Sequence, residues 1–393
     1  PTSMLAWLRA CGLLDLTDDK LVRLTPAGAQ WAARIDWTPE PLAPEEPPLL
    51  PTGTGVAALH QAEPTVMAVP PFDEIYEHIA RRGTFDKLLV ASLHAGLWAN
   101  SRRHFAILTG LSGAGKTLLA MAYAEAVTAR TPTERQPIRP VPVQPGWSDS
   151  TSLVGYVNPL RPDTYVRTPF LDFLLSAAAD PEHPYVAVLD EMNLSHPEQY
   201  LAPLLSAMET PGASIDLHRE GDVFDGVPAS IPYPSNLVLI GTVNMDETTH
   251  GLSDKVLDRA LTLEFWDINI DAYPRWGQHG LPADAESKAR QVLKDLGELL
   301  APARLHFGWR VIDDVLNFFA KSLETGASHS DVLDMIVLAQ IVPQLRGDDS
   351  ARFRDALTGC GEILRRHGLN RAARRVADLL DDLKTTGTAR FWR

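Results

Sequence analysis

The chain has 393 residues, of which 45% are hydrophobic and 22% charged. It is therefore long enough for two or three domains with a large core, and its composition is that of an ordinary globular protein. A formal net charge of −14 argues against a protein that coats nucleic acid over its whole surface, although a small basic channel stays compatible with it. No apolar run approaches the roughly 20 residues of a membrane span and no secretory signal opens the sequence, which predicts a cytoplasmic location and no membrane partner.

The first 38 residues predict a small module. The stretch SMLAWLRACGLLD indicates a helix, and a short strand then leads through Thr25 and Pro26 into another helix. This order resembles the latter half of a winged-helix domain, a fold that often binds DNA. Half a domain without a basic cluster is equally typical of a packing or protein-contact module, so both interpretations stay open. Because the first residue is Pro rather than Met, we expect that an N-terminal portion is missing.

A linker follows, predicted over residues 39–71. Six prolines lie between Pro39 and Pro51 with few residues to bury, a composition that favours an extended chain. Residues 72–100 then carry isoleucines and leucines at helical spacing, and we expect this segment to pack beside the site described next.

Residues 104–265 alternate short apolar strands with helices. The clearest strands are FAILTG, PYVAVLD and NLVLIGTVN, and this alternation predicts a parallel sheet with helices on both faces. Residues 284–393 are mostly helical in pattern, with segments such as SKARQVLKDLGELL, RVIDDVLNFFAKSL, DVLDMIVLAQIV and AARRVADLLDDLK. The two cysteines, Cys11 and Cys360, match no metal spacing and are expected to be buried thiols.

The stretch GLSGAGKT, residues 110–117, lies between an apolar strand and a helix. Its spacing fits Gly-x-x-x-x-Gly-Lys-Thr, in which glycines let backbone N–H groups converge on phosphate oxygens at a helix N-terminus. Lys116 would reach the outer phosphates and the Thr117 hydroxyl would ligate Mg²⁺. The predicted nucleotide-binding residues of this stretch are Gly110, Gly113, Ala114, Gly115, Lys116, Thr117 and Leu118.

Two later strands end on polar side chains that suit phosphoanhydride hydrolysis. YVAVLDEMN delivers Asp190, which would hold Mg²⁺, and Glu191, which would polarise the attacking water. LVLIGTVN ends on Asn244, a neutral donor suited to orienting that water or the terminal phosphate. Each feature alone is also typical of an ordinary strand end or turn, but their order after the Gly-rich loop favours catalysis.

Together these residues resemble the AAA+ superfamily, and within it the McrB-like branch, the motor subunits of modification-dependent restriction systems. The resemblance covers roughly residues 72–393. It rests on the Gly-rich loop and on QPGWSDSTSLVGYVNPL, LDEMNLSHPEQYLAPLLSAMET and GTVNMDETTHGLSDKVLDRALTLEF. It implies a P-loop αβα core over residues 72–270, a helical lid over residues 271–393, ATP or GTP with Mg²⁺ as cofactors, and a ring, most commonly a hexamer.

The resemblance also implies roles for two arginines. Arg259 occupies the position of the arginine finger, which neutralises transition-state charge on the neighbouring subunit's nucleotide. The alternative is a surface salt bridge with Asp254 or Asp258. Arg310 matches an arginine that opens a lid helix and contacts nucleotide bound to the same chain, and a structural capping role is the alternative.

Residues 147–168 correspond to a segment that faces the central pore in the related group. Arg161 and Arg167 would contact a translocated polymer there, whereas Trp147 is better explained as a core aromatic. The resemblance thus implies an anti-phage restriction motor that acts on DNA with a separate nuclease subunit. A MoxR-like chaperone that remodels a protein is the alternative, and a nucleotide-controlled assembly module is a third hypothesis, which intact Glu191 and Arg259 disfavour.

Overall fold

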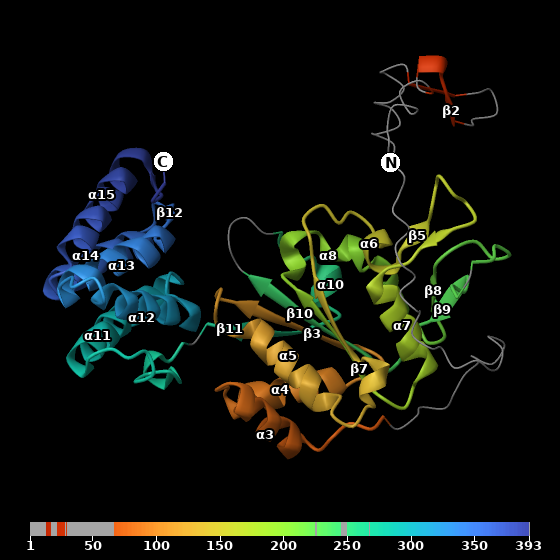
Figure 1. Cartoon of the computed structure of the whole chain (residues 1–393), viewed down its shortest axis with the longest axis horizontal. Coiled ribbons are helices and arrows are strands. Elements are labelled where there is room, and N and C mark those ends of the chain that lie inside the picture. The colour runs from red at the N-terminus through yellow and green to blue at the C-terminus, as the bar shows by residue number, and fades with distance from the viewer. Residues whose placement is uncertain are drawn as a thin grey trace. The chain divides into compact units, whose positions relative to one another are not determined.

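The computed structural model describes residues 13–16, 22–27, 29, 67–224, 226–244, 250–266 and 268–392. Contacts divide the chain into two compact units, Pro1–His60 and Gln61–Arg393, whose elements are shown in Figure 1. Most of the predicted linker lies outside the described residues, as does Cys11, and the domain boundaries stay predictions.

In the first unit, β1 (Leu14–Leu16) pairs antiparallel with β2 (Val22–Leu24), with Leu14 opposite Leu24. The helix predicted for residues 3–15 is therefore wrong at its C-terminal end. Leu-Asp-Leu and Val-Arg-Leu both alternate apolar and polar residues with the period of a strand, and this pattern prevails over the helical spacing before it. The rest of that helix and most of the winged-helix prediction lie outside the described residues.

The second unit contains a five-stranded parallel sheet in the order β11-β3-β10-β7-β4. It confirms the predicted α/β fold class with a parallel sheet. The inner strands are continuous apolar runs because both faces of a parallel sheet are buried. The strands are β3 (His104–Gly110), β4 (Ile138–Pro142), β7 (Tyr185–Asp190), β10 (Leu237–Asn244) and β11 (Leu261–Phe265).

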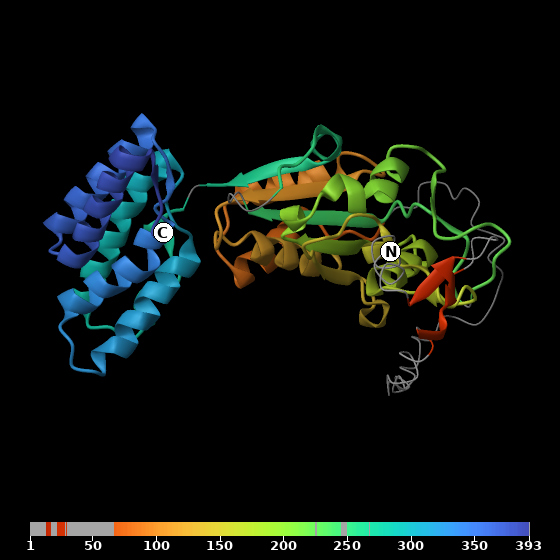
Figure 2. The same cartoon turned by 90° about the horizontal axis from the view of Figure 1, so that it is seen from above.

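Helices cover both faces of this sheet, as Figures 1 and 2 show. Successive side chains of β3 enter different cores: Phe105 and Ile107 pack with α7 to α10, whereas Ala106 and Leu108 pack with α3 to α5. This alternation makes three layers from one sheet. The helices are α3 (Phe72–Arg82), α4 (Lys87–Trp98), α5 (Lys116–Val127), α6 (Thr151–Val154), α7 (Pro169–Ala179), α8 (Pro197–Tyr200), α9 (Ala202–Ala207) and α10 (Asp254–Leu257).

Two hairpins extend from the connections between these elements. The first joins β5 (Tyr156–Val157) to β6 (Tyr165–Val166), and the second joins β8 (Ser214–Asp216) to β9 (Ser230–Pro232). They contact each other through Tyr165, whose ring lies edge-on to Phe224 at a centroid distance of 5.8 Å.

The C-terminal part is helical, as predicted, and has its own apolar core. One of its helices, residues 351–366, is not among the segments that the sequence analysis names. Its buried positions, which include Phe353, Leu357, Cys360 and Leu364, follow helical spacing, but Gly359 and Gly361 interrupt the apolar signal. Its elements are α11 (Ala283–Leu300), α12 (Trp309–Leu323), α13 (His329–Gln340), β12 (Gly347–Asp348), α14 (Ala351–Arg366), α15 (Asn370–Thr386) and β13 (Thr388–Ala389). Among the described residues, none of the helices combines the length and apolar character needed to cross a bilayer.

Cys360 is a free, fully buried thiol, and burial raises its pKa to about 12. At pH 8 it is therefore protonated and shielded, and a thiolate-specific reagent such as DTNB is expected to leave it unmodified in the native protein. Unfolding in guanidinium should expose one reactive thiol in a Cys11→Ser variant, which removes the other cysteine. Rapid modification of that variant under native conditions would show that α14 opens readily.

Candidate functional site

The segment from Gly110 to Thr117 forms the turn between β3 and α5. Gly110, Gly113 and Gly115 have φ values of 125°, 73° and 95°, a region that residues with a side chain rarely adopt. Gly115 is the N-cap of α5, so the unpaired N–H groups of the first helical turn open onto this loop. The partial positive charge of the helix N-terminus adds to them, and the loop therefore has the geometry of a phosphate site.

Lys116 is buried, with 5% of its surface exposed, and its ammonium group lies inside the loop. Nζ donates to the carbonyl oxygens of Gly110 at 3.1 Å and Leu111 at 2.7 Å. These bonds hold the cation beside the turn and satisfy part of its hydrogen-bonding capacity. The charge is therefore fixed at the turn, inside the loop from Gly110 to Thr117.

The other two predicted residues of this stretch differ in environment. Ala114 is half-buried against the core under α5. Leu118 is exposed on α5, close to Phe85: a methyl group at Gly83 would lie 2.9 Å from the Phe85 ring and 3.1 Å from Leu118. Leu118 and Phe85 thus form an apolar surface next to the loop.

Strand order brings Thr117 and Asp190 together. The Thr117 hydroxyl donates to Oδ1 of Asp190 at 2.8 Å, and the hydroxyl of Thr242 donates to the same oxygen at 2.7 Å. Hydroxyl and carboxylate oxygens are the ligands that Mg²⁺ prefers, and one or two of them commonly suffice because phosphates supply the rest. The donor set present here therefore fits Mg²⁺.

Glu191 and Asn244 also meet. Asn244 Nδ2 donates to Oε1 of Glu191 at 3.0 Å, which fixes the direction of an exposed carboxylate. Glu191 has a φ of 51° and a ψ of 47°, a left-handed conformation that costs energy for a residue with a side chain. Its backbone N–H donates to the hydroxyl of Thr242 at 2.9 Å, a bond that helps to hold this conformation.

Thr242 is a residue that the sequence analysis missed. It lies two positions before Asn244 on β10, and residues two apart on a strand share a face. Because β10 lies next to β7, the Thr242 hydroxyl contacts both members of the acidic pair, Oδ1 of Asp190 and the backbone N–H of Glu191. A polar residue in the otherwise apolar run LVLIGTV is the signal that identifies it.

Arg259 lies apart from this cluster, just before β11. Its Nη2 donates to Glu209 at 2.6 Å, its Nε to the Leu205 carbonyl at 3.1 Å and its Nη1 to the Lys255 carbonyl at 2.7 Å. The ion pair therefore forms with Glu209 and not with Asp254 or Asp258, the partners considered from the sequence. Only 21% of the side chain is exposed.

Arg310 lies in the first turn of α12, beside the phosphate loop. A methyl group at Gly113 would lie 2.8 Å from Cβ of Arg310, and one at Gly308 would lie 2.6 Å from the carbonyl carbon of Gly113. Glycine is required at both positions for this close approach. The side chain of Arg310 is exposed and begins next to the turn, so nucleotide contact stays a prediction compatible with its place.

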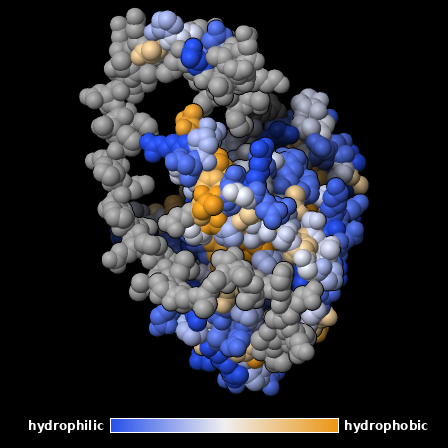
Figure 3. All heavy atoms as spheres, turned by 90° about the vertical axis from the view of Figure 1, so that its right-hand side faces the viewer, coloured by the Kyte–Doolittle hydropathy of each residue, from blue (hydrophilic) through white to orange (hydrophobic). Residues whose placement is uncertain are grey.

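The residues predicted to face a pore lie on or near the first hairpin. Trp147 is half-buried and packs edge-on against Tyr200 with centroids 5.4 Å apart, as the core interpretation expects. Arg167 forms an ion pair with Asp172 and donates to the Gly226 carbonyl, so it links the two hairpins. Arg161 is exposed at the turn beside Leu160, which is 89% exposed. Figure 3 shows this end of the core, where apolar side chains lie among polar ones.

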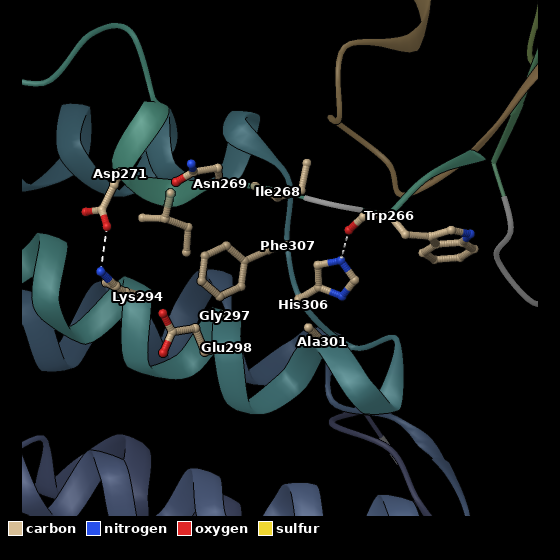
Figure 4. A pocket seen from close by; sticks show the side chains of 11 residues that line it. Trp266, Ile268, Asn269, Asp271, Lys294, Gly297, Glu298, Ala301, His306 and Phe307 are labelled. Carbon is tan, nitrogen blue, oxygen red and sulfur yellow. Dashed lines mark hydrogen bonds and ion pairs between the residues drawn. The ribbon is translucent and has the colours of Figure 1, made fainter. Parts of the chain in front are cut away.

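A cavity of about 330 Å³ lies at the start of the helical part and contains none of the predicted site residues (Figure 4). An ion pair between Asp271 and Lys294 at 2.5 Å closes one side of it. On the other side, His306 contacts the Trp266 carbonyl at 2.5 Å. The first contact holds the turn after the sheet against α11, and the second joins the residue after β11 to the segment before α12.

Comparison with known proteins gives a family match to the C-terminal part of the chain and a similarity to a solved structure. Residues 267–388 match a family described as a domain of unknown function (DUF8727), and no curated protein matches the chain. The chain is similar to the crystal structure of NtrX from Brucella abortus in complex with ADP, at 14% identity, with a TM-score of 0.36, over 79% of this chain and 71% of that chain. That TM-score is too low to support an argument about function.

Proposed function

We propose that this chain is a P-loop nucleoside triphosphatase of the AAA+ type. One observation carries the proposal: the ends of three adjacent strands bring a phosphate loop with its buried lysine, a hydroxyl–carboxylate pair and an oriented glutamate into one place. Crevices at the carboxyl ends of parallel strands are where α/β proteins bind ligands. The same side-chain types are those that phosphoryl transfer to water requires.

The roles follow from these positions. Lys116 and the N–H groups of the loop would bind the β- and γ-phosphates of ATP or GTP. Thr117 and Asp190 would hold Mg²⁺, which neutralises phosphate charge when bound. Glu191 would accept a proton from the attacking water while Asn244 keeps its carboxylate aligned, and nucleoside diphosphate and phosphate leave as products.

The finer role rests on the resemblance of the sequence to McrB-like motors. We infer a homo-oligomeric ring, most simply a hexamer, that moves DNA and controls a separate nuclease subunit. Exposed Arg161 at the hairpin turn is the described residue that best supports contact with a phosphate backbone. A MoxR-like chaperone remains the alternative, because exposed Leu160 beside it would equally suit a protein client.

Replacing Glu191 by glutamine is expected to preserve nucleotide binding and to slow hydrolysis by about 10²–10⁴-fold, since the amide cannot accept the proton. Binding of a fluorescent nucleotide and release of phosphate measure the two effects separately. Glu182→Gln, a change at an exposed acid just before β7, is the matched control and should hydrolyse at the wild-type rate. Hydrolysis by Glu191→Gln at that same rate would refute the assignment of the base.

The proposed role is tested by phosphate release from ATP and from GTP, with and without duplex DNA, while the mass of the assembly is measured. Stimulation by DNA that weakens with added salt supports the motor, because phosphate contacts release counterions. Turnover indifferent to DNA, together with a reproducible non-nuclease protein in the complex purified from the native host, would favour the chaperone. Absence of turnover under every condition would favour the assembly module.

A further inference from the structure

We propose that Arg103 is a second cation, beside Arg259, that contacts the terminal phosphate of the nucleotide bound to a neighbouring subunit. The proposal rests on the proposed function and adds a residue to it. Its basis is a cavity of about 280 Å³ at the end of the sheet opposite the phosphate loop, and both arginines line this cavity. Asn100, Phe105 and Asp258 are also part of its wall.

The parallel sheet brings the two arginines together. β11 pairs parallel with β3 in the register Leu261 opposite Ala106, so the two strands begin at the same end of the sheet. Arg103 immediately precedes β3 and Arg259 lies two residues before β11. The phosphate loop follows the other end of β3, so a phosphate in this cavity must come from outside the subunit.

Arg102 and Arg103 lie in the turn before β3, and their side chains differ in their contacts. Asn100 Oδ1 accepts from the backbone N–H groups of both residues at 3.0 Å, which fixes the turn. The Arg102 guanidinium then donates to the carbonyls of Ala207, the last residue of α9, and Thr210. Arg103 is half-buried, and its side chain forms no hydrogen bond or ion pair with the residues that the structure describes.

Arg259 has fewer N–H groups left for a ligand than Arg103. Three of its five N–H groups are already used by Glu209, Leu205 and Lys255, so two remain for a ligand. A terminal phosphate has three oxygens, which exceed what this one side chain can satisfy. Arg103 lines the same cavity, and the described residues use none of the N–H groups of its guanidinium. The planar geometry of this group suits bidentate binding of phosphate.

One acid opposes this arrangement. Asp258 lines the same cavity, and its carboxylate competes with a phosphate for both arginines. Against a phosphate of about two negative charges, two guanidinium groups outweigh a single exposed carboxylate. The Asp258→Asn variant should therefore hydrolyse nucleotide faster than wild type, and slower hydrolysis would contradict an anion site.

The experiment compares Arg103→Ala, Arg103→Lys and the control Arg374→Ala, an exposed arginine on α15. Arg103→Ala is expected to bind nucleotide with wild-type affinity and to hydrolyse it about 10–100-fold more slowly, because it loses charge-assisted bonds made in the transition state. Arg103→Lys should retain part of the rate, since it keeps the charge. Arg374→Ala should match wild type.

Mixing separates a role across the interface from a structural one. Rings of Arg103→Ala and Lys116→Ala subunits should regain activity, because one supplies an intact phosphate loop and the other intact arginines. No recovery in rings shown by mass to be mixed, or dissociation of Arg103→Ala rings, would overturn the proposal. The proposed function itself fails separately, if the wild-type protein neither binds nor hydrolyses nucleotide.

Discussion

Replacement of Lys116 by alanine is expected to weaken nucleotide binding by about 100-fold or more. The ammonium group is buried and aimed into the phosphate loop by bonds to the Gly110 and Leu111 carbonyls. A charged hydrogen bond of this kind contributes about 1.5–3 kcal/mol, and the empty space would also loosen the turn that places the N–H groups. Titration calorimetry with a non-hydrolysable analogue measures the loss directly.

The control for this change is Lys384→Ala, at an exposed lysine near the end of α15. It alters the net charge by the same amount and should bind nucleotide like wild type. Lys116→Met keeps the packed stem and removes only the charge, so it distinguishes a lost phosphate contact from a collapsed loop. Wild-type affinity in Lys116→Met would show that the cation is not part of the site.

Replacement of Arg259 by alanine should leave nucleotide bound and reduce its hydrolysis by about 10³–10⁵-fold, the range known for an arginine finger supplied by a partner. The expectation follows from its place at the edge of the sheet away from its own phosphate loop. Steady-state phosphate release and nucleotide affinity together test it. A variant that loses binding as well would indicate a structural role.

Subunit mixing tests whether Arg259 acts across the interface between two subunits. Rings that combine Arg259→Ala with Lys116→Ala subunits should regain some activity at interfaces where an intact finger meets an intact loop. Glu209→Gln offers a complementary measurement, because Glu209 forms an ion pair with Arg259 at 2.6 Å within the same subunit. If Glu209 restrains the finger, its replacement should raise turnover at low protein concentration, where assembly is limiting.

Much of the core could be predicted from sequence because its signals are local. Buried parallel strands require continuous apolar runs, and the turn after β3 requires glycines in left-handed conformations at Gly110, Gly113 and Gly115. The order of the strands in the sheet, by contrast, depends on packing between distant segments. That order brings Thr242 against Asp190 and Glu191, which lie 52 and 51 residues earlier in the chain, so motif spacing could not identify Thr242 as part of this cluster.

Other differences have the same origin. The partner of Arg259 is 50 residues away, so the local choice of Asp254 or Asp258 could not indicate Glu209. The residues of β1 form a strand because they pair with β2, whereas the apolar spacing of the residues before them favours a helix. In α14, contact with α11 stabilises a helix despite its glycines, one of which approaches Leu299 closely.

The length of β3 has a consequence for mixtures of functional and damaged copies. Seven residues at about 3.3 Å each separate Arg103 from the phosphate loop by roughly 20 Å, well beyond the reach of one side chain. In the proposed ring, every subunit then supplies the phosphate loop of one reaction centre and the arginines of the next. A copy that lacks both its phosphate loop and its arginines would inactivate two reaction centres. A defective allele expressed beside the normal one should therefore be dominant-negative and reduce activity by more than its share of the subunits.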